Sequence, residues 1–203
     1  MKKLFIVLFL LSNYTFSQVK PSTDITFQVV NNESKIIWQD VPFLGNNPHE
    51  GIIQLTSGTL VTSANGKAKG GNFVINMNSI VSMNIKSGKK YDGITDHLKS
   101  DDFFSTARYP TATFVITKIV SGTKPDQYTI TGNLTIKGIS KAITFPAIIG
   151  TGQDKINAQA TVIINRTLWG ITYKSYNLLA QMKDDMIPND IQLTLNLVFS
   201  KVL

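Results

Sequence analysis

Hydrophobic and polar residues alternate one by one through much of this 203-residue chain. The clearest case lies near the C-terminus, where residues 191–199 place an aliphatic or aromatic side chain at every odd position. Gln192, Thr194 and Asn196 stand between them. A period of two puts successive side chains on opposite faces of a strand, so one face is apolar and the other polar. The segment is therefore predicted to be a strand with one buried face.

Eight further segments have a strand-like pattern: 26–31, 35–40, 51–60, 73–79, 111–118, 128–138, 141–147 and 156–165. Turn-forming residues separate them, among them Asn65-Gly66 and Gly70-Gly71. Many strands joined by short turns indicate an antiparallel sandwich or barrel, and the lack of helix–strand alternation argues against a parallel α/β fold. Residues 91–104 and 178–187 lack the period of two, and we expect a short helix in one or both of them.

A sheet of about eight strands can close on itself, and its interior is then either filled by side chains or able to hold one small ligand. The inward-facing set combines long or aromatic side chains such as Met77 and Phe145 with small ones such as Ala158 and Ala160, which leave space. The sequence thus predicts an all-β fold, an extended antiparallel barrel of about eight strands with one or two short helices. Such an interior permits an elongated apolar cavity.

The first 17 residues follow another pattern. Two lysines precede an apolar run over residues 4–11, and small residues follow up to Ser17. This layout predicts a secretory signal peptide over residues 1–17, a single domain over 18–203 and a periplasmic or secreted location. The apolar run is far shorter than the ~20 residues of a membrane span, so we expect no transmembrane segment. The chain has no cysteine, so its core must stabilise it without disulfides.

The formal net charge of +7 raises the question of an anionic partner. The lysines are scattered, however, and Arg108 and Arg166 are the only arginines in the sequence. Base readout and bidentate phosphate contacts favour arginine, so nucleic-acid binding is not expected. A homodimer is compatible with the sequence, which does not fix the oligomeric state.

The segment HLKSDDFFSTARYPTATF, residues 97–114, gathers the most polar chemistry. His97 and Asp101 are four residues apart and could share a helix face, but two ligands do not make a zinc site. The adjacent Asp101 and Asp102 would diverge on a helix and would not form a facing carboxylate pair. No nucleophile elbow, phosphate-binding loop or dinucleotide fingerprint is present. The sequence therefore predicts no metal site, no cofactor and no catalytic residue.

Arg166 is in phase with Val162 and Ile164, so its guanidinium is predicted to point inward near the mouth of the barrel. A buried charge needs partners. One interpretation pairs Arg166 with a carboxylate such as Asp40, or has it cap loop carbonyls; the other has it hold the charged head group of a ligand. His49 is in phase with Ile53 and Leu55, and a hydrogen-bonded core histidine is the favoured interpretation.

Several motifs in the same order resemble the YceI-like family of secreted proteins. They are HLKSDDFFSTARYPTATF, GNLTIKGISKAITFPA and INRTLWGI, with HEGIIQLTSGTL and GGNFVINMNSI before them and KDDMIPNDIQLTLNLVF at the end. The resemblance covers nearly all of residues 24–200. It implies a lipocalin-like barrel with an apolar channel, and members of the family are described as binding polyisoprenoid or other long-chain amphiphiles without catalysis.

We therefore expect a protein that binds, transports or stores an amphiphilic lipid, either a polyisoprenoid, an isoprenoid quinone or a fatty-acyl compound. The residues predicted to contact the ligand are Ile36, Trp38, Ile53, Leu55, Phe73, Ile75, Met77, Phe114, Ile116, Leu134, Phe145, Val162, Arg166 and Leu195, with Arg166 as the polar anchor. Two alternatives stay open. One is an enzyme that acts on a lipidic substrate through His97, Asp101 or Arg166, and the other is an interaction barrel with a filled core.

Overall fold

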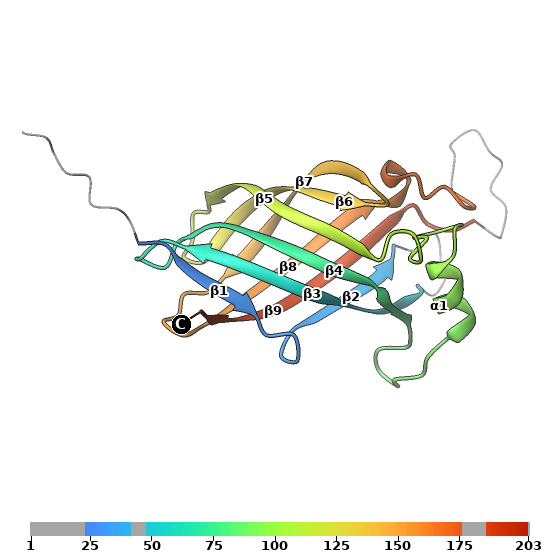
Figure 1. Ribbon diagram of the computed structural model, residues 1–203, viewed down its shortest axis with the longest axis horizontal. Helices are drawn as coiled ribbons and strands as arrows, with labels where there is room; N and C mark the ends of the chain where they lie inside the picture. The colour runs from blue at the N-terminus through green and yellow to red at the C-terminus, as the bar shows by residue number, and fades with distance from the viewer. Residues whose placement is uncertain (1–22, 42–47, 176–185, 203) are drawn as a thin grey trace, which may run out of the picture.

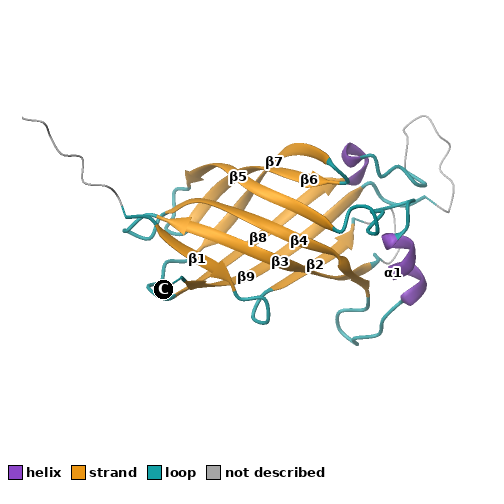
Figure 2. Cartoon of the chain, in the orientation of Figure 1, coloured by secondary structure: helices purple, strands orange, loops and turns teal. Residues whose placement is uncertain are grey.

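A computed structural model describes residues 23–41, 48–175 and 186–202, which form one antiparallel sheet and one α-helix (Figures 1 and 2). The strands are β1 (Ile25–Val29), β2 (Lys35–Asp40), β3 (Glu50–Thr62), β4 (Ala68–Ser82), β5 (Thr111–Ser121), β6 (Gln127–Ile136), β7 (Ile139–Ile149), β8 (Lys155–Asn165) and β9 (Asp190–Lys201). The helix is α1 (Asp92–Lys99), and a 3₁₀ turn, η1 (Arg166–Trp169), follows β8.

The sheet closes into a barrel because β3 pairs with β4 as well as with the first two strands. β1 and β2 both run antiparallel to β3 and to β9, β1 against one half of these strands and β2 against the other. The two strands thus occupy one position of the barrel, interrupted by the turn over residues 30–34. The result is a closed antiparallel barrel of eight strand positions, as the sequence predicted.

The strand segments predicted from the alternation all coincide with observed strands, which extend beyond them in most cases. In β6 the alternation is nearly strict, with Tyr128, Ile130, Leu134 and Ile136 buried. One turn prediction is wrong, because Gly70-Gly71 lies inside β4, where it pairs with Leu60 and Val61 of β3. A side chain at position 71 would lie about 2.5 Å from the carbonyl oxygen of Thr59, so this close strand approach needs glycine there.

The helix predicted within residues 91–104 is α1, which lies at the end of the barrel where β4 ends and β5 begins (Figure 1). The turns that follow it bury Phe103 and Phe104 at this end of the barrel. Most of the second helix prediction, over residues 178–187, lies outside the described residues. The 3₁₀ turn η1 was not predicted; it ends at Gly170, whose φ of 72° is the left-handed conformation that glycine adopts without strain.

Candidate functional site

The barrel encloses an apolar cavity of about 190 Å³. Strands from the whole circumference contribute to its lining, because each strand turns every second side chain inward. The thirteen apolar residues that the sequence predicted all lie on the lining: Ile36, Trp38, Ile53, Leu55, Phe73, Ile75, Met77, Phe114, Ile116, Leu134, Phe145, Val162 and Leu195. Their position is therefore as predicted, while contact with a ligand stays a prediction.

The prediction left out other lining residues. They include Leu60, Ile80, Phe104, Ala112, Ile130, Ile136, Ile143, Ala147, Ile149, Ala158, Ala160, Ile164, Ile191, Leu193, Leu197 and Phe199. Most of them lie on the same face of their strands as the thirteen predicted residues. The period of two therefore predicts their inward position as well. Gln159 is the one polar residue among the described residues of the lining, and its side chain is exposed, because its position between Ala158 and Ala160 is out of phase with the inward set.

Phenylalanine rings form a connected layer inside the cavity. Phe73 of β4 stacks on Phe114 of β5 with 6.3 Å between ring centroids, and it meets Phe199 of β9 edge-on at 6.1 Å. Phe114 in turn lies 5.6 Å from the ring of Phe145 of β7. Gly132 of β6, the register partner of Ile116, lies against this ring, and a Cβ there would come within 2.4 Å of the Phe114 ring. The ring can lie flat against β6 only because position 132 carries no side chain.

The size of the cavity limits what it can accept. Sites for drug-sized ligands usually have about 300–1,000 Å³. A cavity so narrow and so apolar suits a single slim hydrocarbon chain, and a longer chain requires neighbouring side chains to move.

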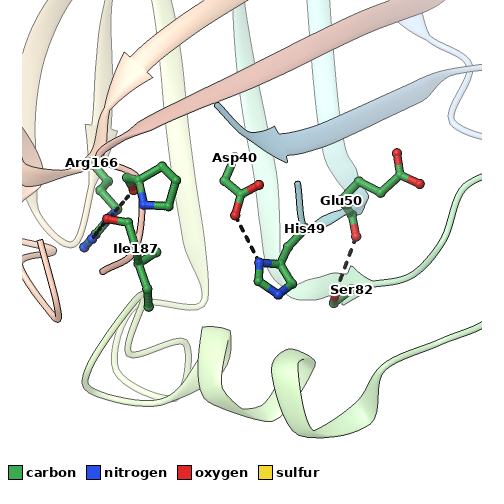
Figure 3. A network of polar contacts seen from close by, with 7 residues as sticks. Asp40, His49, Glu50, Ser82, Arg166 and Ile187 are labelled. Atoms are coloured by element: carbon green, nitrogen blue, oxygen red, sulfur yellow. Dashed lines mark hydrogen bonds and ion pairs between the residues drawn. The ribbon is translucent and has the colours of Figure 1, made fainter. Parts of the chain in front are cut away.

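Arg166 is buried, at 1% exposure, but it does not line the cavity. Its guanidinium donates four hydrogen bonds to backbone carbonyls of the segments that follow β8 and precede β9. Figure 3 shows Arg166 beside Ile187, one of the four acceptors. The acceptors are the carbonyl oxygens of Pro188 (2.9 Å), Ile171 (2.7 Å), Tyr173 (2.9 Å) and Ile187 (3.0 Å). The face of the ring of Phe103 lies 5.6 Å from the guanidinium carbon.

These contacts correspond to the interpretation in which Arg166 caps loop carbonyls. Burial lowers the pKa of the guanidinium from its usual value, since desolvation disfavours the charged form. Four charge-assisted hydrogen bonds offset that cost. The expectation that Arg166 anchors a ligand head group finds no support in its position, because its donors face the loops and not the cavity.

The inward-facing core histidine expected at position 49 is not observed. The His49 side chain is 58% exposed, and its Nδ1 lies 3.0 Å from Oδ2 of Asp40 at the end of β2 (Figure 3). The prediction extended the alternation of Ile53 and Leu55 back to position 49. It is wrong because β3 begins only at Glu50, so the alternation does not include His49. Asp40, which was considered as a partner of Arg166, is therefore paired with His49 instead.

The other histidine, His97, lies on the outside of the barrel near the end of α1. Its Nε2 is 3.0 Å from Oδ2 of Asp102. The rings of Phe103 and Tyr173 contact it edge-on at 5.0 and 4.8 Å. Within the described ranges no group of three or more His, Asp or Glu side chains is placed to hold a metal ion. None of the helices described there is long and apolar enough to cross a membrane.

Comparison with known proteins adds two kinds of similarity. The chain is 33% identical over 125 residues to a UPF0312 protein of Shewanella denitrificans, which covers 61% of this chain and 58% of that protein. It is 46% identical over 59 residues to Protein YceI of Escherichia coli O157:H7, which covers 29% of this chain and 30% of that protein. The matched segments thus span less than two thirds of these curated relatives.

Two solved structures share the fold. One is BcnA of Burkholderia cenocepacia, with a TM-score of 0.66, 21% identity and coverage of 84% of this chain and 98% of that one. The other is a polyisoprenoid binding domain from Saccharophagus degradans, with a TM-score of 0.60, 14% identity and coverage of 88% and 99%. The family model of the YceI-like domain matches residues 26–199, which is nearly the whole barrel. This chain belongs to the YceI-like family.

Proposed function

We propose that this protein binds the hydrocarbon chain of an amphiphilic lipid inside the barrel. One observation carries the proposal: among the described residues that line the cavity, every inward-facing side chain is apolar and none is titratable. Such an interior offers no general acid, base, nucleophile or metal ligand to a substrate. It offers dispersion contacts and exclusion of water, which are what a hydrocarbon chain needs.

The affinity would come from burial alone. Each methylene transferred from water to an apolar site contributes about 0.8 kcal/mol, which is about a fourfold change in the dissociation constant. A chain that fills the space now present would gain this amount for each methylene that it buries. Longer chains gain more only if lining side chains move, and the flexible Met77 and the Phe73–Phe114 pair are placed to do so.

A polyisoprenoid, an isoprenoid quinone and a fatty-acyl compound all have chains of suitable width. The polyisoprenoid binding domain of Saccharophagus degradans shares this fold, which supports the first of these classes for the present chain. We further propose that residues 1–17 are a signal peptide, that residues 18–203 form one domain and that this domain works in the periplasm or outside the cell. These proposals agree with a ligand that must be carried through water.

Native mass spectrometry of the purified protein, followed by organic extraction, tests the proposal directly. We expect a co-purifying species with a long prenyl or acyl chain that is released on denaturation. The delipidated protein should then bind prenyl alcohols and fatty acids of increasing length, with a dissociation constant that falls about fourfold per methylene until the cavity is full. A barrel that carries no lipid and gains no thermal stability from any of these compounds would instead be an interaction barrel with a filled core.

A further inference from the structure

The barrel has a weak seam between β7 and β8. Each of these strands has eleven residues, yet they pair at only three positions, Ala147–Ile149 with Ala158–Ala160. By contrast, β6 pairs with β7 at ten positions and β8 with β9 at eleven. The pairing of β7 with β8 therefore stops just beyond their hairpin, and the rest of the two strands is not joined by the ladder.

The sequence supplies a physical reason for this break at Pro146. Gly150 donates its N–H to the carbonyl of Asn157 on the β8 side, whereas Ile149 donates to the carbonyl of Asp126 on the β6 side. The backbone N–H groups of successive residues point to opposite sides of a strand. The backbone nitrogen of residue 146 therefore points toward β8, as those of residues 148 and 150 do. Proline has no N–H to donate there, so the ladder cannot continue from Ala147 toward the other end of β7.

A groove of about 620 Å³ lies on the outside of the barrel at this seam. Pro146 and Ile148 of β7 line it on one side, and Thr161 of β8 lines it on the other. Four residues line both this outer groove and the inner cavity: Ala147, Gln159, Ala160 and Leu195. Ala147 and Ala160 are direct partners across the seam, so the groove and the cavity are separated there by backbone and two methyl groups.

Large buried side chains lie at both ends of the barrel. Phe103 and Trp169 lie at the end that α1 covers, and Phe27, Tyr128 and Ile156 lie at the other. None of these five residues lines the cavity, so they stand between it and the ends of the described barrel. A chain that enters along the barrel axis must displace these large buried side chains, which costs more than parting two alanines.

Apolar side chains also gather on the outer surface beside the seam. Eight large hydrophobic residues of the described chain are exposed, and four of them come from β7, β8 and η1. These four are Ile139, Ile148, Ile163 and Leu168, each at least 38% exposed. Ile148 lines the groove itself. Exposed apolar residues beside a groove are typical of a surface that contacts an apolar partner.

From these observations we infer that the seam between β7 and β8 is a lateral gate through which the hydrocarbon chain of a lipid passes between the outer groove and the cavity. The gate consists of the three residue pairs that join the strands, with Ala147 and Ala160 at its inner side. The inference rests on the proposed lipid-binding function and adds the path and the residues that control exchange. It assigns the outer groove as the first place where the chain contacts the protein.

The test is to join the two strands of the gate with an engineered disulfide. The sequence has no cysteine, so no native thiol competes with the engineered pair. The variant Ile148→Cys/Gln159→Cys joins an outward-facing pair whose Cα separation in an antiparallel ladder, about 5.5 Å, suits a disulfide. The matched control Thr131→Cys/Thr144→Cys staples β6 to β7, where the two hydroxyl oxygens are 3.0 Å apart. Stopped-flow measurements with a fluorescent fatty acid give association and dissociation rates for oxidised and reduced forms.

We expect the oxidised gate staple to slow both association and dissociation at least tenfold, with little change in affinity, and reduction to restore both rates. The control staple should leave them unchanged. Pro146→Val, which restores a donor toward β8, should slow exchange in the same sense without a disulfide. If the oxidised gate staple exchanges the probe as fast as the parent chain does, the lateral gate is refuted while lipid binding stands. If the parent chain itself binds no probe, the proposed function and the gate fail together.

Discussion

Nη1 of Arg166 donates to the carbonyl oxygen of Ile171 at 2.7 Å, across the turn that follows β8. The bond belongs to a set of four through which one buried side chain ties the segment after β8 to the segment before β9. The four carbonyls that accept these bonds lie in the segments between η1 and β9, outside the named helices and strands. Arg166 is therefore a structural residue of the barrel end that α1 covers, and its burial does not indicate a ligand site.

Replacing Arg166 with methionine should destabilise the fold. It should not weaken the binding of one class of ligand more than that of another. Removal of the guanidinium leaves four carbonyl acceptors without this donor, and bonds to a charged donor contribute about 1.5–3 kcal/mol each. We expect the free energy of unfolding to fall by at least about 3 kcal/mol in urea denaturation. Arg108→Met is the matched control, because Arg108 is exposed and should change stability by less than about 1 kcal/mol.

The same variant separates the two interpretations of Arg166. A structural residue should affect the binding of a fatty acid and of a prenyl alcohol to the same extent. A selective loss of affinity for the charged fatty acid would restore the role of a polar anchor. Calorimetric titration of both ligands into Arg166→Met at a temperature where the variant is folded distinguishes these outcomes.

The alternative of an enzyme centred on His97 makes a different prediction. His97 lies outside the cavity and contacts Asp102, Phe103 and Tyr173. His97→Ala should therefore leave lipid affinity within twofold of the parent value and lower stability by about 1 kcal/mol, through the loss of its aromatic contacts. Turnover of a lipid ester by the parent chain that disappears in His97→Ala, with binding retained, would overturn this expectation.

Much of the barrel could be predicted from the sequence because a strand with one buried face repeats every two residues. The same period placed Trp38, Phe73 and Leu195 on the cavity lining. It could not supply the partners of Arg166, whose four acceptors lie 5 to 22 residues further along the chain in irregular segments. It also failed at His49, one residue before the strand begins.

The sequence contains a sign of the seam between β7 and β8. Pro146 interrupts a segment that otherwise alternates, and a proline inside a strand indicates a break in one of its two ladders. Which ladder is broken depends on the side that position 146 faces. That side follows from the register of the hairpin, which the alternation of hydrophobic residues alone does not define.

The two tryptophans of the chain offer an internal reporter of binding. Trp38 lines the cavity, whereas Trp169 is buried away from it, and each indole donates one hydrogen bond to a backbone carbonyl. Binding of a lipid chain should therefore change the emission of Trp38 and leave that of Trp169 unaltered. We expect Trp38→Phe to abolish the ligand-induced change in fluorescence and Trp169→Phe to retain it. The opposite result would place the ligand outside the cavity.

Filling the cavity should weaken binding in proportion to the space that is lost. Ala158 faces the cavity, while its neighbour Asn157 faces outward and is exposed. Ala158→Leu adds three carbon atoms to the interior and should exclude about three methylenes of the ligand, a loss of about 2.4 kcal/mol or about sixtyfold in affinity. Asn157→Leu makes a leucine on the opposite face of the same strand and should change affinity less than twofold. Titration of both variants with one fatty acid compares them, and equal affinities would show that the chain does not occupy the space beside Ala158.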